Sequence, residues 1–466
     1  MAVTGVEAQS GRTPAPANQE NSTESNKIAD GDLSAKAMFD EANAYLRNKF
    51  IEFDEKKVPV SEALRLRTEQ EKKQLAAKYA AILAERKDLS SEDVYYHGLL
   101  HWIADNIDGT LASFERYLTF SDIDAERSQR SRSLIVVSAA KLGDVEKAVA
   151  TLAEYKKAEP VKLAETARMN SEIAKAFVKK SEPQKAAEHA KTSYAASKAM
   201  LVQPSTQARG LDEMLDAGML AFEAYRELGK VKEADEILLD MRASAGSFGS
   251  PSFYFYAADK LIIYMIESGR KPLALETYLT TLIDAGRTLK QKPHQDEVIN
   301  KIKRRERHYK LLGEKASELV SIDHWFPGEP RTLESMRGKV ILLDFWATWC
   351  GPCFDAFPHL IEWQRDHADD GLAILGVTRY YGRVDGITAD RPHELSFLKR
   401  FREKHKLNYD ILVAKDQQSQ LLYNATALPT AILIDRKGVI RYIETGSSPS
   451  RLEEMRAMML KLLAEK

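Results

Sequence analysis

Both cysteines of this 466-residue chain lie in one short stretch, Trp349-Cys350-Gly351-Pro352-Cys353. The stretch follows an apolar run and precedes residues with helical spacing, so we expect it to join a buried strand to a helix. Two thiols separated by two residues can close a small disulfide ring, and a thiol at a helix N-terminus is stabilised as the nucleophilic thiolate. A zinc site would need further ligands at matching spacing, and the sequence has no second cysteine pair. The stretch therefore predicts a redox-active dithiol.

An aspartate interrupts the apolar run before the cysteines. Residues 340–346 suit a central strand that is covered on both faces, and Asp344 lies inside it. An unpaired charge in a dry strand is costly, so Asp344 is expected to stay protonated or to find a partner. A carboxyl with a raised pKa near Cys353 can accept and return a thiol proton. A solvated aspartate at the strand end is the alternative.

The segments around the cysteine pair alternate between helix and strand signals. Apolar residues recur at helical spacing after Cys353, and Pro358 lies inside that pattern as an expected kink. Pro429 stands at the start of an apolar strand, which is tolerable at an edge or as a cis bond. Further strands are expected at 319–322, 431–435 and 439–443, with a turn-rich connection at 323–330, a hairpin turn at 436–438 and helices at 394–404 and 451–465. This order predicts a βαβ arrangement with helices on both faces of a sheet.

Four features occur in an order that is typical of one family. They are the cysteine pair, the preceding Asp344, Pro358 and the step Leu428-Pro429-Thr430. In these features, residues 316–466 resemble a thioredoxin-fold domain of the TlpA/ResA type in the redoxin (AhpC/TSA) superfamily. One departure is the long, polar segment 379–392, which predicts an unusual client surface.

The resemblance implies a thiol:disulfide oxidoreductase that acts on protein clients and is recharged by an upstream thiol reductant. It implies that Cys350 attacks, that Cys353 resolves, and that Pro429 is cis and faces the disulfide. It also implies that the backbone of Leu428 receives an extended client strand. We expect the substrate-binding surface to comprise Trp349, Gly351, Pro352, Leu428 and Pro429, and the catalytic residues to be Cys350, Cys353 and Asp344. No cofactor beyond the dithiol and no metal is expected.

The Gly-Pro dipeptide between the cysteines resembles that of reducing members, which favours a disulfide reductase. Two alternatives stay open. The related redoxin fold also supports thiol peroxidases, although a paired C-x-x-C favours disulfide exchange. The second alternative is an interaction scaffold in which helices bind partners and the redox domain is accessory. The reduction potential would separate a reductase from an oxidase or isomerase.

Residues 33–312 carry helical patterns throughout, and Ser61 and Ser90 are expected helix N-caps. A repeat is visible in this region, in which a glycine lies five residues before an alanine. The pairs are Gly143 and Ala148, Gly229 and Ala234, and Gly269 and Ala274, with Ser181 and Ala186 as a degenerate copy and Ala112, after Asp108-Gly109, as the expected start. Glycine permits a tight left-handed stop between helices, and alanine permits their close approach. The region resembles irregular tetratricopeptide repeats, and a plain helical bundle is the alternative.

The remaining features bound the organisation and the partners. We expect a two-domain protein, an all-α repeat domain at 33–312 followed by an α/β thioredoxin fold at 316–466. Residues 1–32 are expected to be a disordered tail, compatible with the remnant of a signal peptide. The net charge of −1 argues against nucleic-acid binding, and no apolar run is long enough to span a membrane. The basic stretch 301–307 predicts a solvated helix between the domains.

Two expectations concern the surroundings of the protein. The repeat domain is expected to present a surface for a protein partner. A cysteine count restricted to the active pair is compatible with the bacterial periplasm or cell envelope, and the cytoplasm is the alternative.

Overall fold

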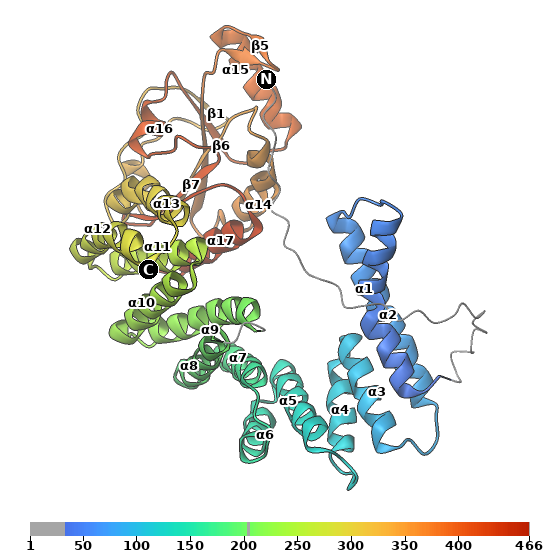
Figure 1. Cartoon of the computed structure of the whole chain (residues 1–466). Helices are drawn as coiled ribbons and strands as arrows, with labels where there is room; N and C mark the ends of the chain where they lie inside the picture. Colours follow the sequence, from blue (N-terminus) through green and yellow to red (C-terminus); the bar gives the residue numbers. More distant parts are fainter. Residues whose placement is uncertain (1–32, 203–205, 466) are drawn as a thin grey trace, which may run out of the picture. The chain divides into compact units, whose positions relative to one another are not determined.

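The computed structural model describes residues 33–202 and 206–465, and the expectation for residues 1–32 lies outside them. The described residues form a long helical part followed by an α/β part (Figure 1). The chain divides into two compact units, one ending at Glu165 and the other beginning at Thr166, and each is described by itself. The second unit holds the later helices together with the whole α/β part.

The helical part consists of antiparallel helices joined by short turns. Its helices are α1 (Ala35–Glu55), α2 (Glu62–Ala84), α3 (Ser91–Ile103), α4 (Ile107–Tyr117), α5 (Ala125–Leu142), α6 (Val145–Lys157), α7 (Leu163–Lys179), α8 (Pro183–Met200), α9 (Gln207–Glu227), α10 (Val231–Phe248), α11 (Pro251–Glu267), α12 (Lys271–Thr288) and α13 (Lys292–Leu311). The expected caps are confirmed, because the side chains of Ser61 and Ser90 accept from Leu64 N and Asp93 N. Ser90 and Asp93 complete a capping box.

The repeat is visible as a recurring left-handed turn. Gly143, Gly229 and Gly269 have φ of 85°, 66° and 76°, as the sequence predicts. Ser181 takes the same conformation, with φ of 56°. The residues five positions after these turns are all buried: Ala148, Ala186, Ala234 and Ala274. Each turn therefore places a small residue where two helices pack together.

The expected first copy of the repeat is wrong by a few residues. Gly109 lies inside α4 and Ala112 is exposed. The left-handed turn is instead at Asp105, with φ of 62°, and the buried residue five positions later is Thr110. The Thr110 hydroxyl donates to Asn106 O at 2.8 Å, so a threonine can fill this buried place. Gly109 indicated a turn at the wrong position, because here the left-handed residue is Asp105.

The α/β part has a mixed sheet with the strand order β1-β6-β3-β2-β7-β8. Its elements are β1 (Ile322–Phe326), β2 (Val340–Phe345), α14 (Gly351–His367), β3 (Leu372–Arg379), β4 (Arg383–Val384), β5 (Ile387–Thr388), α15 (Arg391–Lys404), β6 (Asp410–Ala414), α16 (Gln418–Leu422), β7 (Thr430–Ile434), β8 (Ile440–Thr445) and α17 (Pro449–Ala464). Strands β2, β3 and β6 are parallel, and β1, β7 and β8 pair antiparallel. The strand expected at 319–322 lies at 322–326 instead, because Ser321 adopts φ of 57° and breaks the extended backbone.

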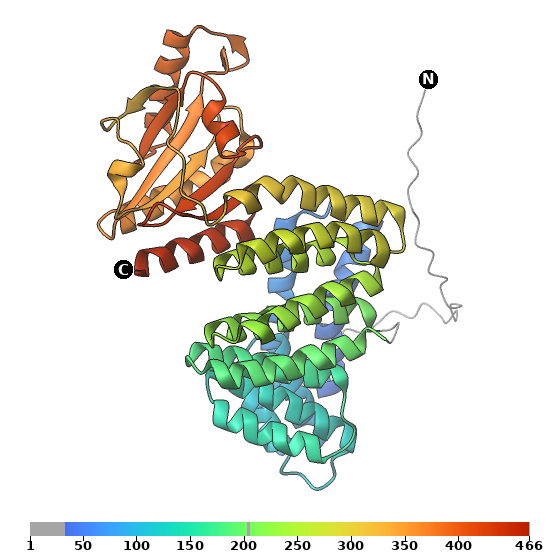
Figure 2. The same cartoon turned by 90° about the vertical axis from the view of Figure 1, so that its left-hand side faces the viewer.

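The two faces of the sheet belong to different apolar clusters. Val340 and Leu342 of β2 pack with residues of α14, α15 and α17, whereas Ile341, Leu343 and Phe345 join a cluster on the other face. That second cluster continues through the apolar residues of α9 to α13. The α/β part and the later helices therefore share one core (Figure 2).

A buried ion cluster accompanies this shared core. The Arg305 guanidinium on α13 donates to Asp259 Oδ1 on α11 at 3.1 Å and to Glu444 Oε2 on β8 at 3.0 Å. The Tyr309 hydroxyl also donates to Asp259, at 2.5 Å. The expectation of a solvated basic helix is therefore wrong for Arg305, which is 8% exposed. Its charge pairs with one carboxylate on α11 and one on β8, so it links the later helices to the sheet.

Candidate active site

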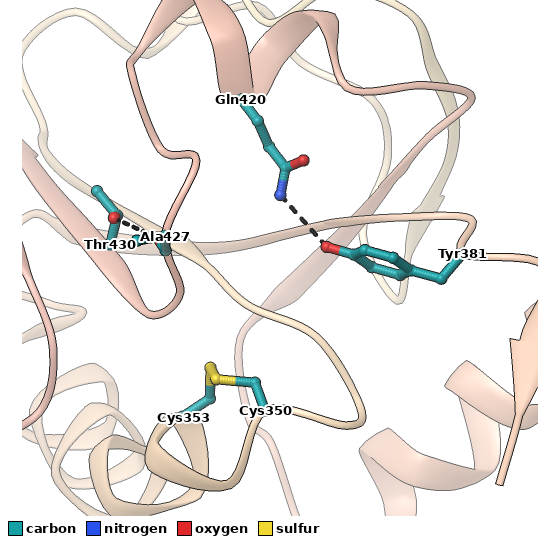
Figure 3. Close-up of a disulfide and its surroundings, with 6 residues drawn as sticks. All are labelled: Cys350, Cys353, Tyr381, Gln420, Ala427 and Thr430. Atoms are coloured by element: carbon teal, nitrogen blue, oxygen red, sulfur yellow. Dashed lines mark hydrogen bonds between the residues drawn. A yellow bond between two sulfur atoms is a disulfide. The ribbon is translucent and has the colours of Figure 1, made fainter. Parts of the chain in front are cut away.

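The two cysteines form a disulfide at the start of α14 (Figure 3). Cys350 is the N-cap residue of this helix, and Gly351 and Pro352 are its first residues. The first backbone N–H groups of a helix lack partners within the helix, and their dipoles favour a negative charge at this position. Cys350 is 4% exposed and Cys353 is fully buried. Both cysteines are therefore buried, and the small exposed fraction of the pair belongs to Cys350.

Asp344 lies buried near the end of β2, 2% exposed. Burial raises the pKa of its carboxyl to about 7. Its Oδ2 has no hydrogen-bond partner among the described residues. The solvated strand end considered as the alternative is therefore wrong for this residue. At neutral pH, Asp344 can both release and take up a proton.

Two further polar atoms lie unpaired in the same neighbourhood. Tyr409 is buried close to Asp344, and burial together with the Asp344 charge raises the pKa of the tyrosine hydroxyl. Within the described residues, neither the Tyr409 hydroxyl nor Trp346 Nε1 has a hydrogen-bond partner. Gly376 pairs with Asp344 across the strands, and a Cβ there would come within about 3.1 Å of both rings. The glycine therefore makes room for the two rings beside the carboxyl. The sequence did not single out Tyr409, because nothing in its local pattern marks it.

A pair of aromatic residues, an exposed tryptophan and a half-buried tyrosine, flanks the disulfide on one side. Trp349 is 62% exposed, and its ring meets that of Tyr381 edge to face, at 5.3 Å between centroids. The Arg379 guanidinium lies 4.1 Å from the Tyr381 ring centre. Gln420 of α16 donates to the Tyr381 hydroxyl at 3.3 Å (Figure 3). These contacts fix Tyr381 beside Trp349, the first residue of the motif.

The segment 379–392 forms a small hairpin, β4–β5, which extends this surface. Its base is held by Glu394, a buried carboxylate that accepts from Tyr381 N at 2.7 Å and Gly382 N at 2.9 Å. A pocket of about 570 Å³ lies between the motif and the hairpin. Its lining residues are Thr348, Trp349, Tyr381, Arg383, Asp385 and Gly386. The sequence indicated an unusual segment here, but it did not single out Tyr381 or Glu394 as supports of the surface.

The loop before β7 lies on another side of the disulfide. The Leu428-Pro429 peptide bond is cis, as the resemblance implies. Pro429 is buried and Leu428 is half-buried, whereas Thr426 and Ala427 are exposed. The Thr430 hydroxyl donates to Ala427 O at 2.7 Å and closes the turn that Figure 3 shows over the disulfide. The expected site residues therefore come from three adjacent places: strand β2, the start of α14 and this loop.

The arrangement combines a disulfide at a helix start, a buried carboxyl that titrates near neutral pH, and exposed surface around Cys350. Chemically, it is suited to thiol–disulfide exchange. Within residues 33–202 and 206–465, no group of three or more His, Cys, Asp or Glu side chains is arranged to hold a metal ion. No helix in the same residues is long and apolar enough to cross a membrane.

Comparison with known proteins places the α/β part in one family. Residues 313–443 match the AhpC/TSA family. The thioredoxin-like protein YneN of Bacillus subtilis is 32% identical over 129 residues, which are 28% of this chain and 69% of YneN. The thiol-disulfide oxidoreductase ResA of Geobacillus kaustophilus is 32% identical over 136 residues, or 29% of this chain and 70% of ResA.

A larger relative matches over the same extent. The protein DipZ of Mycobacterium tuberculosis is 33% identical over 145 residues, which are 30% of this chain but only 19% of DipZ. The chain thus spans about a fifth of the length of that relative. YneN and ResA, by contrast, are covered over more than two thirds of their length. With its disulfide at the start of α14, this chain therefore belongs to the thioredoxin-like thiol-disulfide oxidoreductases of the AhpC/TSA family.

Proposed function

We propose that the chain is a disulfide reductase for protein clients. The observation that carries this proposal is the disulfide at the start of α14, with Cys350 at the N-cap and Cys353 inside the helix. A nucleophile must reach the client, whereas the resolving thiol only has to reach its neighbour. The relatives named ResA are thiol-disulfide oxidoreductases, which supports the same chemistry.

The reaction has two exchange steps. The Cys350 thiolate attacks one sulfur of the client disulfide; a mixed disulfide forms, and the other client sulfur leaves as a thiolate and takes up a proton. Cys353 then loses its proton and attacks the Cys350 sulfur, and the second client sulfur leaves. Two electrons and two protons have passed to the client, and the Cys350–Cys353 disulfide remains. An upstream dithiol reductant returns the enzyme to the reduced state by the reverse exchange.

Asp344 is proposed as the proton acceptor for Cys353. Its carboxyl is buried and its pKa is raised to about 7, so it exchanges protons in the range where a thiol must be activated. Trp349, Gly351, Pro352, Leu428 and Pro429 are proposed to line the client surface. The exposed Trp349 and the half-buried Leu428 support this assignment, since they lie on the two segments that flank the disulfide.

The test is a pair of serine variants in the full chain. Cys353→Ser should accumulate a mixed disulfide with a peptide disulfide, because the resolving step is lost, and Cys350→Ser should form none. Turnover should vanish in both variants, with a dithiol reductant and a chromogenic peptide disulfide as substrates. Trapping by Cys350→Ser alone would reverse the assignment of roles. Faster consumption of a hydroperoxide than of the peptide disulfide would favour the thiol peroxidase instead.

We further propose a location in the bacterial periplasm or cell envelope, with the cytoplasm as the alternative. The use of cysteine supports this, since both cysteines form the disulfide and none is left to be oxidised elsewhere. A fusion of the protein, expressed from its own gene, to alkaline phosphatase should be active, because that reporter needs an oxidising compartment. An inactive phosphatase fusion with a fluorescent cytoplasmic fusion would contradict the proposal.

A further inference from the structure

A second surface reaches the loop before Pro429 and has no part in the chemistry described above. A cleft of about 1080 Å³ lies where α13 meets the loop before β7 and the end of β8. On one side it is lined by α13, whose residues there are mostly basic but include Glu306. On the other side it is lined by Thr426, Ala427 and the ion pair of Arg451 with Glu444. The cleft therefore joins the basic stretch of the sequence to the loop that precedes Pro429.

The positive charge of this cleft is only partly balanced by the protein itself. Lys301 and Lys310 pair with glutamates of their own helix, and Arg305 is used in the buried ion cluster. The other three basic residues of α13 in the cleft are Lys303, Arg304 and Arg307, which are all exposed. In the described part of the chain, no carboxylate lies within 4 Å of any of these three. Three cations close together on one helix repel each other unless an anion comes between them.

A buried histidine marks the same place. His308 lines the cleft, is 5% exposed, and neither ring nitrogen makes a hydrogen bond of normal geometry within the described residues. The backbone of Asn424 lies close enough to affect its pKa, which burial and then Arg305 lower to about 4. The neutral ring thus keeps one N–H donor and one acceptor. Both ring nitrogens are themselves buried, so His308 forms part of the wall of the cleft and is not a contact for its occupant.

The position of the cleft indicates what occupies it. Thr426 and Ala427, which line it, stand directly before Leu428 and Pro429, and Figure 3 shows Ala427 on the turn over the disulfide. A polypeptide held at Leu428 while its sulfur meets Cys350 therefore has the basic cleft beside it. The segment that fits this cleft is therefore a continuation of the client polypeptide. Because the unpaired side chains of the cleft are cations, the segment that they attract carries negative charge.

We propose that this cleft binds an acidic segment of the client, and so selects clients in which aspartates or glutamates lie near the disulfide. The inference rests on the proposed function, because it names the substrate class of that same site. The attraction between the cleft and the client is electrostatic and acts between solvent-exposed charges, so it weakens as the salt concentration is raised.

The experiment compares two peptide disulfides that differ only in a flank of glutamates or of glutamines. The full chain should reduce the glutamate peptide with a kcat/KM about tenfold higher at low salt, an advantage expected from a few exposed charge pairs. In the variant Lys303→Glu/Arg304→Glu/Arg307→Glu, the ratio of the two kcat/KM values should fall to about one or below. A matched variant, Arg287→Glu/Lys290→Glu/Lys292→Glu, makes the same change of charge around the end of α12 and the start of α13, and should keep the ratio.

Binding is measured separately from turnover, so that the two proposals can fail independently. A fluorescent glutamate peptide without cysteine should bind the oxidised full chain, and the variant at 303, 304 and 307 should bind it at least tenfold more weakly. If the peptide binds but neither disulfide is reduced, the proposed function is wrong, and binding of an acidic segment in the basic cleft stands. An unchanged ratio in that variant, or an equal loss in the matched variant, overturns the inference. Tighter binding of a single-stranded oligonucleotide than of the peptide, at equal charge and salt, also overturns it.

Discussion

The turns of the helical repeat and the candidate active site of the α/β domain use buried positions in different ways. In the repeat, the buried positions after each turn are small, and the polar one, Thr110, satisfies its hydroxyl within its own helix. In the α/β domain, Asp344 has a buried oxygen without a partner and a pKa raised to about 7. Residues of the first kind can be exchanged for others of similar size, at a cost set by packing. Residues of the second kind are costly to the fold, and a function explains why they are there.

The ion cluster around Arg305 connects the later helices to the sheet, and the loss of Arg305 should have the largest effect on stability. Replacing Arg305 by Met leaves the half-buried Asp259 and Glu444 without its charge, which should lower the free energy of unfolding by about 3 kcal/mol. Urea unfolding of the full chain measures this. Arg305→Lys keeps the charge but cannot reach both carboxylates with two arms, so an intermediate loss is expected. A loss below about 1 kcal/mol for the Met variant would show that the cluster contributes little.

Replacing Asp344 should change stability in the opposite direction, because this native residue is expected to destabilise the fold. An unfolded aspartate has a pKa of about 3.9, whereas burial raises the pKa of Asp344 to about 7. Between these values the folded chain holds a proton that the unfolded chain has lost, so stability falls as pH rises through this window. The full penalty above pH 7 is about 4 kcal/mol, and Asp344→Asn, which cannot ionise, should recover a part of it, about 2 kcal/mol.

The same variant should lose activity while it gains stability. Without the carboxyl, reduction of a peptide disulfide near pH 7 should slow by about a hundredfold, as for the loss of a general acid–base group. Its rate should also lose the pH dependence centred near 7. Asp435 is the control, since it is buried but accepts from Lys437 N and Val439 N, and Asp435→Asn should lower stability without this change in the pH profile. A stability difference between wild type and Asp344→Asn that is constant from pH 4 to pH 8 would contradict the raised pKa.

Local patterns were enough to predict much of the fold, because strands, caps and turns depend on neighbouring residues. The buried residues of α17, for example, are Leu452, Met455, Met459 and Leu462, the apolar positions of the expected terminal helix. Arg305 could not be predicted in this way. Its partners Asp259 and Glu444 are 46 and 139 positions away, so the local pattern showed only a basic helix.

The candidate site divides in the same way. The cysteine pair and Asp344 could be singled out because their residue types and spacing carry the chemistry. Tyr381 and Tyr409 could not, because each depends on contacts made across the fold: with Trp349 and Gln420 for Tyr381, and with Asp344 for Tyr409. The cleft beside Ala427 likewise exists only where α13 meets the sheet.

Ala234 tests the packing of the repeat, with a moderate effect. It is fully buried five positions after the turn at Gly229. Ala234→Leu adds three carbon atoms at a close helix approach, and should lower the free energy of unfolding by about 1–3 kcal/mol. Reduction of a small peptide disulfide should be unchanged, because the residue is outside the site. Val231→Leu, at an exposed position of the same helix, is the control and should change stability little. Equal effects of the two changes would show that the turn positions are not special.

The smallest expected effect concerns Ser181, where the repeat departs from its own rule. Its φ of 56° is left-handed, a conformation that costs a residue with a side chain roughly 1 kcal/mol and glycine almost nothing. Ser181→Gly should therefore raise the free energy of unfolding by about 0.5 kcal/mol, after the greater freedom of glycine in the unfolded chain is subtracted. The reverse change, Gly143→Ser, should lower it by a similar or larger amount, since Gly143 has φ of 85°. Thermal unfolding of both variants against the wild type measures the pair. If Ser181→Gly destabilises the chain, the serine side chain itself holds this turn, and the glycine rule does not extend to the degenerate copy.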